Sequence, residues 1–140
     1  PLTGDIQLVD QYLESVRAGG GGDQPEAVDA GLQAAVGQNE FRPAARKVIL
    51  LFGDAPPHAD RFADCLRIAS DFNRQDRGVV STVTCRKQTK LREFVEIAQV
   101  GGGEAFLTSD EEQIVTQLMI LVFGSRFRSK VVEAFELMEE

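Results

Sequence analysis

Histidine and cysteine, the residues most used in nucleophile and metal chemistry, are scarce in this 140-residue chain, which has one histidine and two cysteines. His58 is therefore the only histidine that could activate a serine or cysteine, and no GxSxG segment occurs. Cys65 and Cys85 are too few for a disulfide framework and lack the CxxC spacing of a metal site. Because free cysteine behaves as a small buried hydrophobe, we expect two free thiols.

The chain also lacks an excess of basic residues, long apolar runs and phosphate-binding motifs. The chain has 15 Lys and Arg against 22 Asp and Glu, a net charge of -7. This balance argues against a nucleic-acid partner, whose phosphates require a basic face, and fits a cation site or a basic partner surface. No apolar run approaches the roughly 20 residues of a membrane span. Neither GxGxxG nor GxxxxGK[ST] is present, and the glycine run 19–22 follows a predicted helix rather than a strand.

Three short apolar or β-branched runs, at 47–52, 79–84 and 104–107, predict strands, and the first indicates a strand buried on both faces of a parallel sheet. Amphipathic patterns that follow these runs predict helices over about 61–75, 91–100 and 108–123. Strands alternating with helices predict an α/β fold: a three-layer, mostly parallel sheet with helices on both faces and its strands adjacent in chain order.

The remaining segments are predicted to be helical. Thr3 is expected to cap a helix over about 5–18, whose apolar face consists of Ile6, Val9, Leu13 and Val16. A second helix is predicted to begin at Asp23, with Pro25 in its first turn and Glu26 complementing its dipole. We expect residues 1–124 to form the α/β domain and 125–140 a C-terminal amphipathic helix that packs on the domain or binds a partner.

The end of the first predicted strand is the strongest candidate for a site. Gly53 and Asp54 close the strand, and Pro56, Pro57 and His58 follow. Ligands of open α/β sheets bind beyond the carboxyl ends of the strands, so Asp54 is placed to hold a metal or a partner. The alternative is that Asp54 merely bends a turn. With no second histidine in the chain, His58 is expected to shape the turn or to support a metal ligand rather than to be a ligand itself.

Two segments, GGGGDQPEAV at 19–28 and KVILLFGDAPPH at 47–58, together resemble the von Willebrand factor A (vWA) domain. The resemblance is to a bacterial-type branch that carries GGGDxPEAV before a strand ending in GDAPPH, and it covers residues 1–124. It implies a Rossmann-like vWA fold and a module that binds a protein partner. It also implies that a divalent cation, Mg²⁺ or another, at the carboxyl edge of the sheet accepts a carboxylate from that partner.

The cation site of the vWA family (MIDAS) has three parts, and the resemblance supplies two of them. Asp54 matches the aspartate at a strand end, and Asp23 or Glu26 takes the place of the common threonine before a helix. The third part, DxSxS, occurs nowhere in the chain. Mg²⁺ takes about six oxygen ligands, so the site is expected to be incomplete and weak or empty in this chain alone.

The family's first strands, which carry DxSxS, would precede Pro1. We expect them upstream of Pro1 or on another chain; the alternative is that this is a degenerate relative. Two other functions remain open. Asp54, with Asp60 and Asp64, could serve a metal-dependent hydrolase, or the chain could be a structural subunit assembled through its C-terminal helix. No catalytic residue is assigned.

Overall fold

In the computed structural model, which describes residues 2–17 and 25–139, three parallel strands form one sheet. The strands are β1 (Lys47–Gly53), β2 (Gly78–Thr84) and β3 (Gly102–Leu107), and they lie in the order β1-β2-β3. The predicted α/β fold, with neighbouring parallel strands in chain order, is confirmed.

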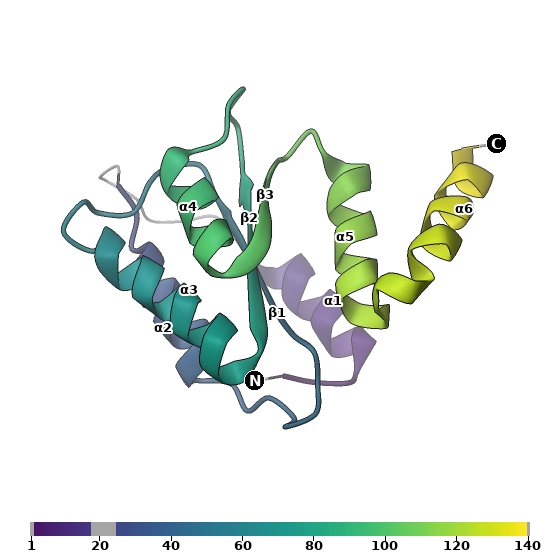
Figure 1. Ribbon diagram of the computed structural model, residues 1–140, viewed down its shortest axis with the longest axis horizontal. Helices are drawn as coiled ribbons and strands as arrows, with labels where there is room; N and C mark the ends of the chain where they lie inside the picture. Colours follow the sequence, from purple (N-terminus) through teal and green to yellow (C-terminus); the bar gives the residue numbers. More distant parts are fainter. Residues whose placement is uncertain (1, 18–24, 140) are drawn as a thin grey trace.

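Helices cover both faces of the sheet. They are α1 (Ile6–Ser15), α2 (Val28–Gly37), α3 (Phe62–Asp76), α4 (Arg92–Val100), α5 (Glu111–Phe123) and α6 (Arg128–Glu139). Helices α2, α3 and α4 lie on one side of the sheet and α5 on the other, with α6 packed outside α5 (Figure 1). None of these helices is both long enough and apolar enough to cross a membrane.

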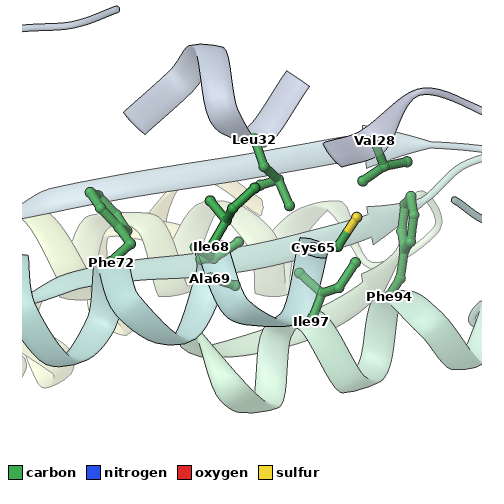
Figure 2. Close-up of a cluster of buried hydrophobic side chains, with 9 residues drawn as sticks. Val28, Leu32, Cys65, Ile68, Ala69, Phe72, Phe94 and Ile97 are labelled. Atoms are coloured by element: carbon green, nitrogen blue, oxygen red, sulfur yellow. The ribbon is translucent and has the colours of Figure 1, made fainter. Parts of the chain in front are cut away.

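Two apolar clusters fill the space between these layers. The larger lies on the side of α2, α3 and α4, and its buried members are Val28, Leu32, Cys65, Ile68, Ala69, Phe72, Val80, Phe94 and Ile97. Figure 2 shows Leu32 and Val28 pointing from α2 toward the side chains of α3. The smaller cluster, on the side of α5, is formed by Val83, Phe106 and Ile114. The central strand β2 contributes to both clusters, which explains its almost complete burial.

Strand β1 is more exposed than its sequence predicts. The expectation of a strand buried on both faces is wrong, since its residues are half-buried and Phe52 is 57 % exposed. Ile49 and Leu51 pack on the larger cluster and Leu50 on the smaller. Within the described residues, however, β1 pairs only with β2, so it is an edge strand.

The two helices before the sheet also differ from the prediction. Asp5, not Thr3, caps α1, because its Oδ1 accepts hydrogen bonds from the N–H groups of Gln7 and Leu8 at 3.0 and 3.4 Å. None of the residues of α1 is buried, so its apolar face is open. Helix α2 begins at Val28, so Glu26 precedes the helix instead of lying in its first turn. Asp23, its predicted cap, lies outside the described residues.

Both cysteines are free thiols, as predicted. Cys65 is fully buried among the side chains of the larger cluster, whereas Cys85, just after β2, is partly exposed. Burial, reinforced by the negative charges of Asp29 and Asp64, raises the pKa of Cys65 from 9.0 to about 11. Cys65 is therefore a packing residue rather than a reactive one.

Candidate functional site

A pocket of about 400 Å³ lies at the carboxyl end of β1. Its walls come from the end of that strand, from α2 and the residues that lead into it, and from α4. The lining residues are Glu26, Ala27, Val28, Gly31, Leu51, Phe52, Gly53, Asp54, Ala55 and Phe94. The pocket thus occupies the position at which open α/β sheets bind ligands.

Backbone pairing sets one wall of this pocket. The N–H of Glu26 donates a hydrogen bond of 2.9 Å to the carbonyl oxygen of Pro56, and Glu26 forms a parallel bridge with Pro57. The segment before α2 is therefore held against the loop after β1. This contact places Glu26 at the same pocket as Asp54, with its backbone extended rather than helical.

The lack of a side chain at Gly53 shapes the floor of the pocket. A Cβ atom at this position would lie 2.7 Å from Cζ of Phe94, well inside van der Waals contact. Gly53 also accepts a 2.7 Å hydrogen bond from the N–H of Cys85, which continues the β1–β2 ladder past the end of β2. A glycine here lets the ring of Phe94 close against the strand.

Asp54 pairs with a residue from the neighbouring strand end. The Nη1 atom of Arg86 lies 3.6 Å from Oδ2 of Asp54, and the two side chains are 85 % and 41 % exposed. Arg86 adopts a left-handed backbone conformation with φ of 57°. An ion pair this exposed contributes little stability and can exchange with other charges. A cation at Asp54 would have to compete with this guanidinium.

The structure brings two of the predicted site residues together. Asp54 and Glu26 line one pocket, whereas Asp23 lies outside the described residues. His58 is not among the residues that line the pocket, and its carbonyl oxygen accepts a 2.9 Å hydrogen bond from the N–H of Arg61. Across residues 2–17 and 25–139, no group of three His, Cys, Asp or Glu residues is placed to hold a metal ion.

The hydrolase alternative also calls for Asp60 and Asp64 beside Asp54. Neither of them lines the pocket. Asp64 instead pairs on the surface of α3 with Arg61 and Arg67, at 3.7 and 3.5 Å. The described carboxylates at the pocket are thus limited to Glu26 and Asp54. Their oxygens are the hard ligands that Mg²⁺ or Mn²⁺ prefers, so they fit part of a divalent-cation site and leave most ligand positions to water or to further protein groups.

Two residues at this site were not identified from the sequence. Phe52 is largely exposed beside the acidic end of β1, where an exposed aromatic ring next to polar groups is typical of protein interfaces. Arg86 follows the end of β2, and Gly53 is paired with Thr84 in the sheet. Applying the strand-end rule to β2 as well as to β1 would have identified Arg86.

Comparison of the chain with protein-family models, with curated proteins and with solved structures found no match.

Proposed function

We propose that this chain is a protein-binding module of the vWA type, which docks its partner at the carboxyl edge of the sheet through the pocket around Asp54. The observation that carries the proposal is the convergence of Glu26 and Asp54 on one pocket. The two residues come from the two segments on which the vWA resemblance rests, 19–28 and 47–58.

The surroundings of Asp54 support a protein ligand rather than a small substrate. The pocket is open, and Phe52, one of its lining residues, exposes much of its side chain at the end of β1. Aromatic side chains are enriched in protein interfaces, where they supply apolar contact area. Glu26 and Asp54 would supply oxygen ligands to a weakly held divalent cation, and such a cation offers an open position to a partner's carboxylate.

The cation step can be tested with the isolated chain. Mn²⁺ added to ¹⁵N-labelled protein should broaden the amide signals of Glu26, Asp54 and their neighbours first, because paramagnetic broadening detects weak binding. Asp54→Asn should remove this selectivity. Asp71→Asn is the matched control, since Asp71 also pairs with an exposed arginine, Arg67, at 4.0 Å on α3. Selective broadening elsewhere, or broadening at Glu26 that survives Asp54→Asn, would place the cation at another site.

Two further variants sharpen the cation test. Arg86→Ala should strengthen the Mn²⁺ effect at Asp54, because it removes the competing guanidinium. Calorimetry should show no tight Mg²⁺ binding by this chain, and tight binding once the chain is extended upstream by a segment with DxSxS. Asp54→Ala in the extended chain should abolish that binding. Tight Mg²⁺ binding by the unextended chain, with an affinity that Asp54→Ala leaves unchanged, would contradict the proposed site.

The docking step needs a probe on the surface itself. Benzoylphenylalanine at position 52 should capture a partner on illumination, whereas the same group at Phe123 should not. Phe123 is a fair control because it is exposed to nearly the same extent, 54 % against 57 % for Phe52. The captured protein, once purified, should bind the wild type more tightly than the Asp54→Asn variant. Equal capture at both positions, or binding that ignores Asp54→Asn, would refute docking at this pocket.

A further inference from the structure

The segment that joins β2 to α4 is strongly basic in a chain whose net charge is -7. Residues 86–92, here called the basic loop, read RKQTKLR, and no carboxylate occurs in the sequence between Asp76 and Glu93. Residues 86–90 and Arg92, the first residue of α4, are exposed. The loop projects beyond the carboxyl end of the sheet (Figure 1), next to the pocket that Asp54 lines.

Hydrogen bonds hold both ends of the basic loop on the sheet. Just before it, the N–H of Cys85 donates to the carbonyl oxygen of Gly53 at 2.7 Å. Near its end, the N–H of Leu91 donates to Oγ1 of Thr84 at 3.1 Å, and Thr84 is only 1 % exposed. The loop thus presents its cations from a fixed base. Such preorganisation lowers the entropy that is lost when a ligand binds.

The cations of the basic loop are available to carboxylates of another molecule. Across the described parts of the chain, 2–17 and 25–139, Lys87 and Lys90 form no ion pair. Arg92 pairs with Glu96 at 3.4 Å on the surface of α4, where the two side chains are 80 % and 41 % exposed. An ion pair this exposed contributes little stability and can exchange with other charges.

Arg86 is held where it can exchange one carboxylate for another. Its φ of 57° lies in the left-handed region, which is unfavourable for a residue with a side chain. Arg77 also has a positive φ, but it ends α3, where this conformation is common. Arg86 ends no helix, and strain of this kind clusters at ligand clamps and switch regions. Because its pair with Asp54 is loose and exposed, an incoming carboxylate can replace Asp54.

We propose that the basic loop binds an acidic segment, with several carboxylates, of the partner protein. The proposal names the chemistry of the partner and rests on the docking at the carboxyl edge of the sheet proposed above. Complementary charge on facing surfaces speeds association and selects among partners. A nucleic acid fits less well, because its continuous phosphates would run on from the loop toward Asp54 and Glu96, whereas a short acidic segment can end with the loop.

The basic loop adds to the pocket without competing for it. Strand β2 lies between β1 and β3, so a strand added at the outer edge of β1 would be separated from this loop by β1 itself. Phe52 stays available for the partner contact proposed above. Asp54 links the two surfaces, because neutralising it, by a divalent cation or by substitution, releases Arg86 for the acidic segment.

A hexaglutamate peptide, titrated into the ¹⁵N-labelled chain in EDTA, tests the loop without any divalent cation. We expect saturable shifts of the amide signals of residues 86–92, and none with hexaglutamine. Lys90→Glu should weaken binding on the order of fivefold, whereas Arg128→Glu should leave it nearly unchanged. Arg128 is a matched control, since it is also exposed and belongs to another basic cluster, at 126–130. Shifts confined to other residues, equal effects of the two variants, or tighter binding of a thymidine oligonucleotide of equal charge would overturn the proposal.

The release of Arg86 is tested in the same titration. Asp54→Asn should strengthen binding of hexaglutamate about two- to fivefold, because Arg86 loses its partner within the chain. In an Arg86→Gln background the same substitution should have a smaller effect, since no guanidinium is left to release. Equal effects in both backgrounds, or weaker binding in Asp54→Asn, would overturn this exchange.

The outcomes distinguish the acidic partner from the cation site. Mn²⁺ broadening that ignores Asp54→Asn would contradict the proposed cation site, but it would not alter a titration performed in EDTA. Conversely, no binding of hexaglutamate to the basic loop, with Mn²⁺ broadening still selective for Asp54, would overturn the acidic partner and leave the cation site supported.

Discussion

Removing the side chain of Leu32 should destabilise the protein far more than removing that of another leucine nearby in the chain. Leu32 is 1 % exposed and, with Val28, anchors α2 in the larger cluster. Truncating a buried leucine to alanine costs about 3 kcal/mol, which includes the cavity left behind. Leu13 on α1 is the matched control, since it is 63 % exposed. Leu13→Ala should change the free energy of unfolding by less than about 0.5 kcal/mol.

The thiol of Cys65, which is buried in the same cluster as Leu32, gives a second measurement of the stability lost in Leu32→Ala. Urea unfolding followed by circular dichroism gives the loss of stability directly. In parallel, Cys65 can be modified only when the cluster opens, so its labelling rate follows the open population. A loss of about 3 kcal/mol should speed labelling roughly a hundredfold. A loss below about 1 kcal/mol in Leu32→Ala, or a similar loss in Leu13→Ala, would refute the assignment of α2 to the core and of α1 to the surface.

Two further predictions concern a crowded glycine and the thiols. Gly78→Ala should lower the free energy of unfolding in urea by about 1–3 kcal/mol, because the added methyl group would collide with the ring of Phe72. Gly31→Ala, in open space on α2, should raise it by about 0.5–1 kcal/mol. Equal effects of the two variants would contradict this packing. Cys85 should react with a thiol reagent faster than Cys65 in the folded protein, and both should react after unfolding without reductant. Because the folded pKa of Cys65 is raised, its contribution to stability is complete below pH 9.0 and is lost as the pH rises toward about 11. The free energy of unfolding of Cys65→Ala should not show this fall at high pH.

The order of the strands could be predicted because it depends on local alternation. Each apolar run is followed by an amphipathic helix, and such units stack their strands in sequence. The burial of β1 could not be predicted in the same way. An apolar run such as that from Lys47 to Phe52 is compatible with a central strand and with an edge strand. Only the presence or absence of a second neighbouring strand distinguishes these positions. A helical period likewise predicted α1 without revealing whether anything would cover its apolar face.

The candidate site was predictable in part for a similar reason. Asp54 follows directly from its place at a strand end. Glu26 was identified through its motif, but its position depends on a hydrogen bond to Pro56 that no local pattern encodes. The helix-start signals at Asp23 and Pro25 favoured an earlier beginning for α2. Pairing of Glu26 with the loop after β1 instead keeps this segment extended until Val28.

The exposure of α1 has a consequence for how the protein unfolds. A ten-residue helix is only marginally stable in water by itself. None of the residues of α1 is buried, so beyond its own backbone the helix is supported mainly by the capping hydrogen bonds at Asp5. It is therefore free to melt while the sheet and the helices on its two faces stay folded. Its amide hydrogens should exchange with solvent almost as fast as those of a free peptide, and those of β2 only on global unfolding. The part of the chain that unfolds cooperatively thus begins at α2. Helix α1 lies outside that unit, and any contact on its apolar face would stabilise it as a helix.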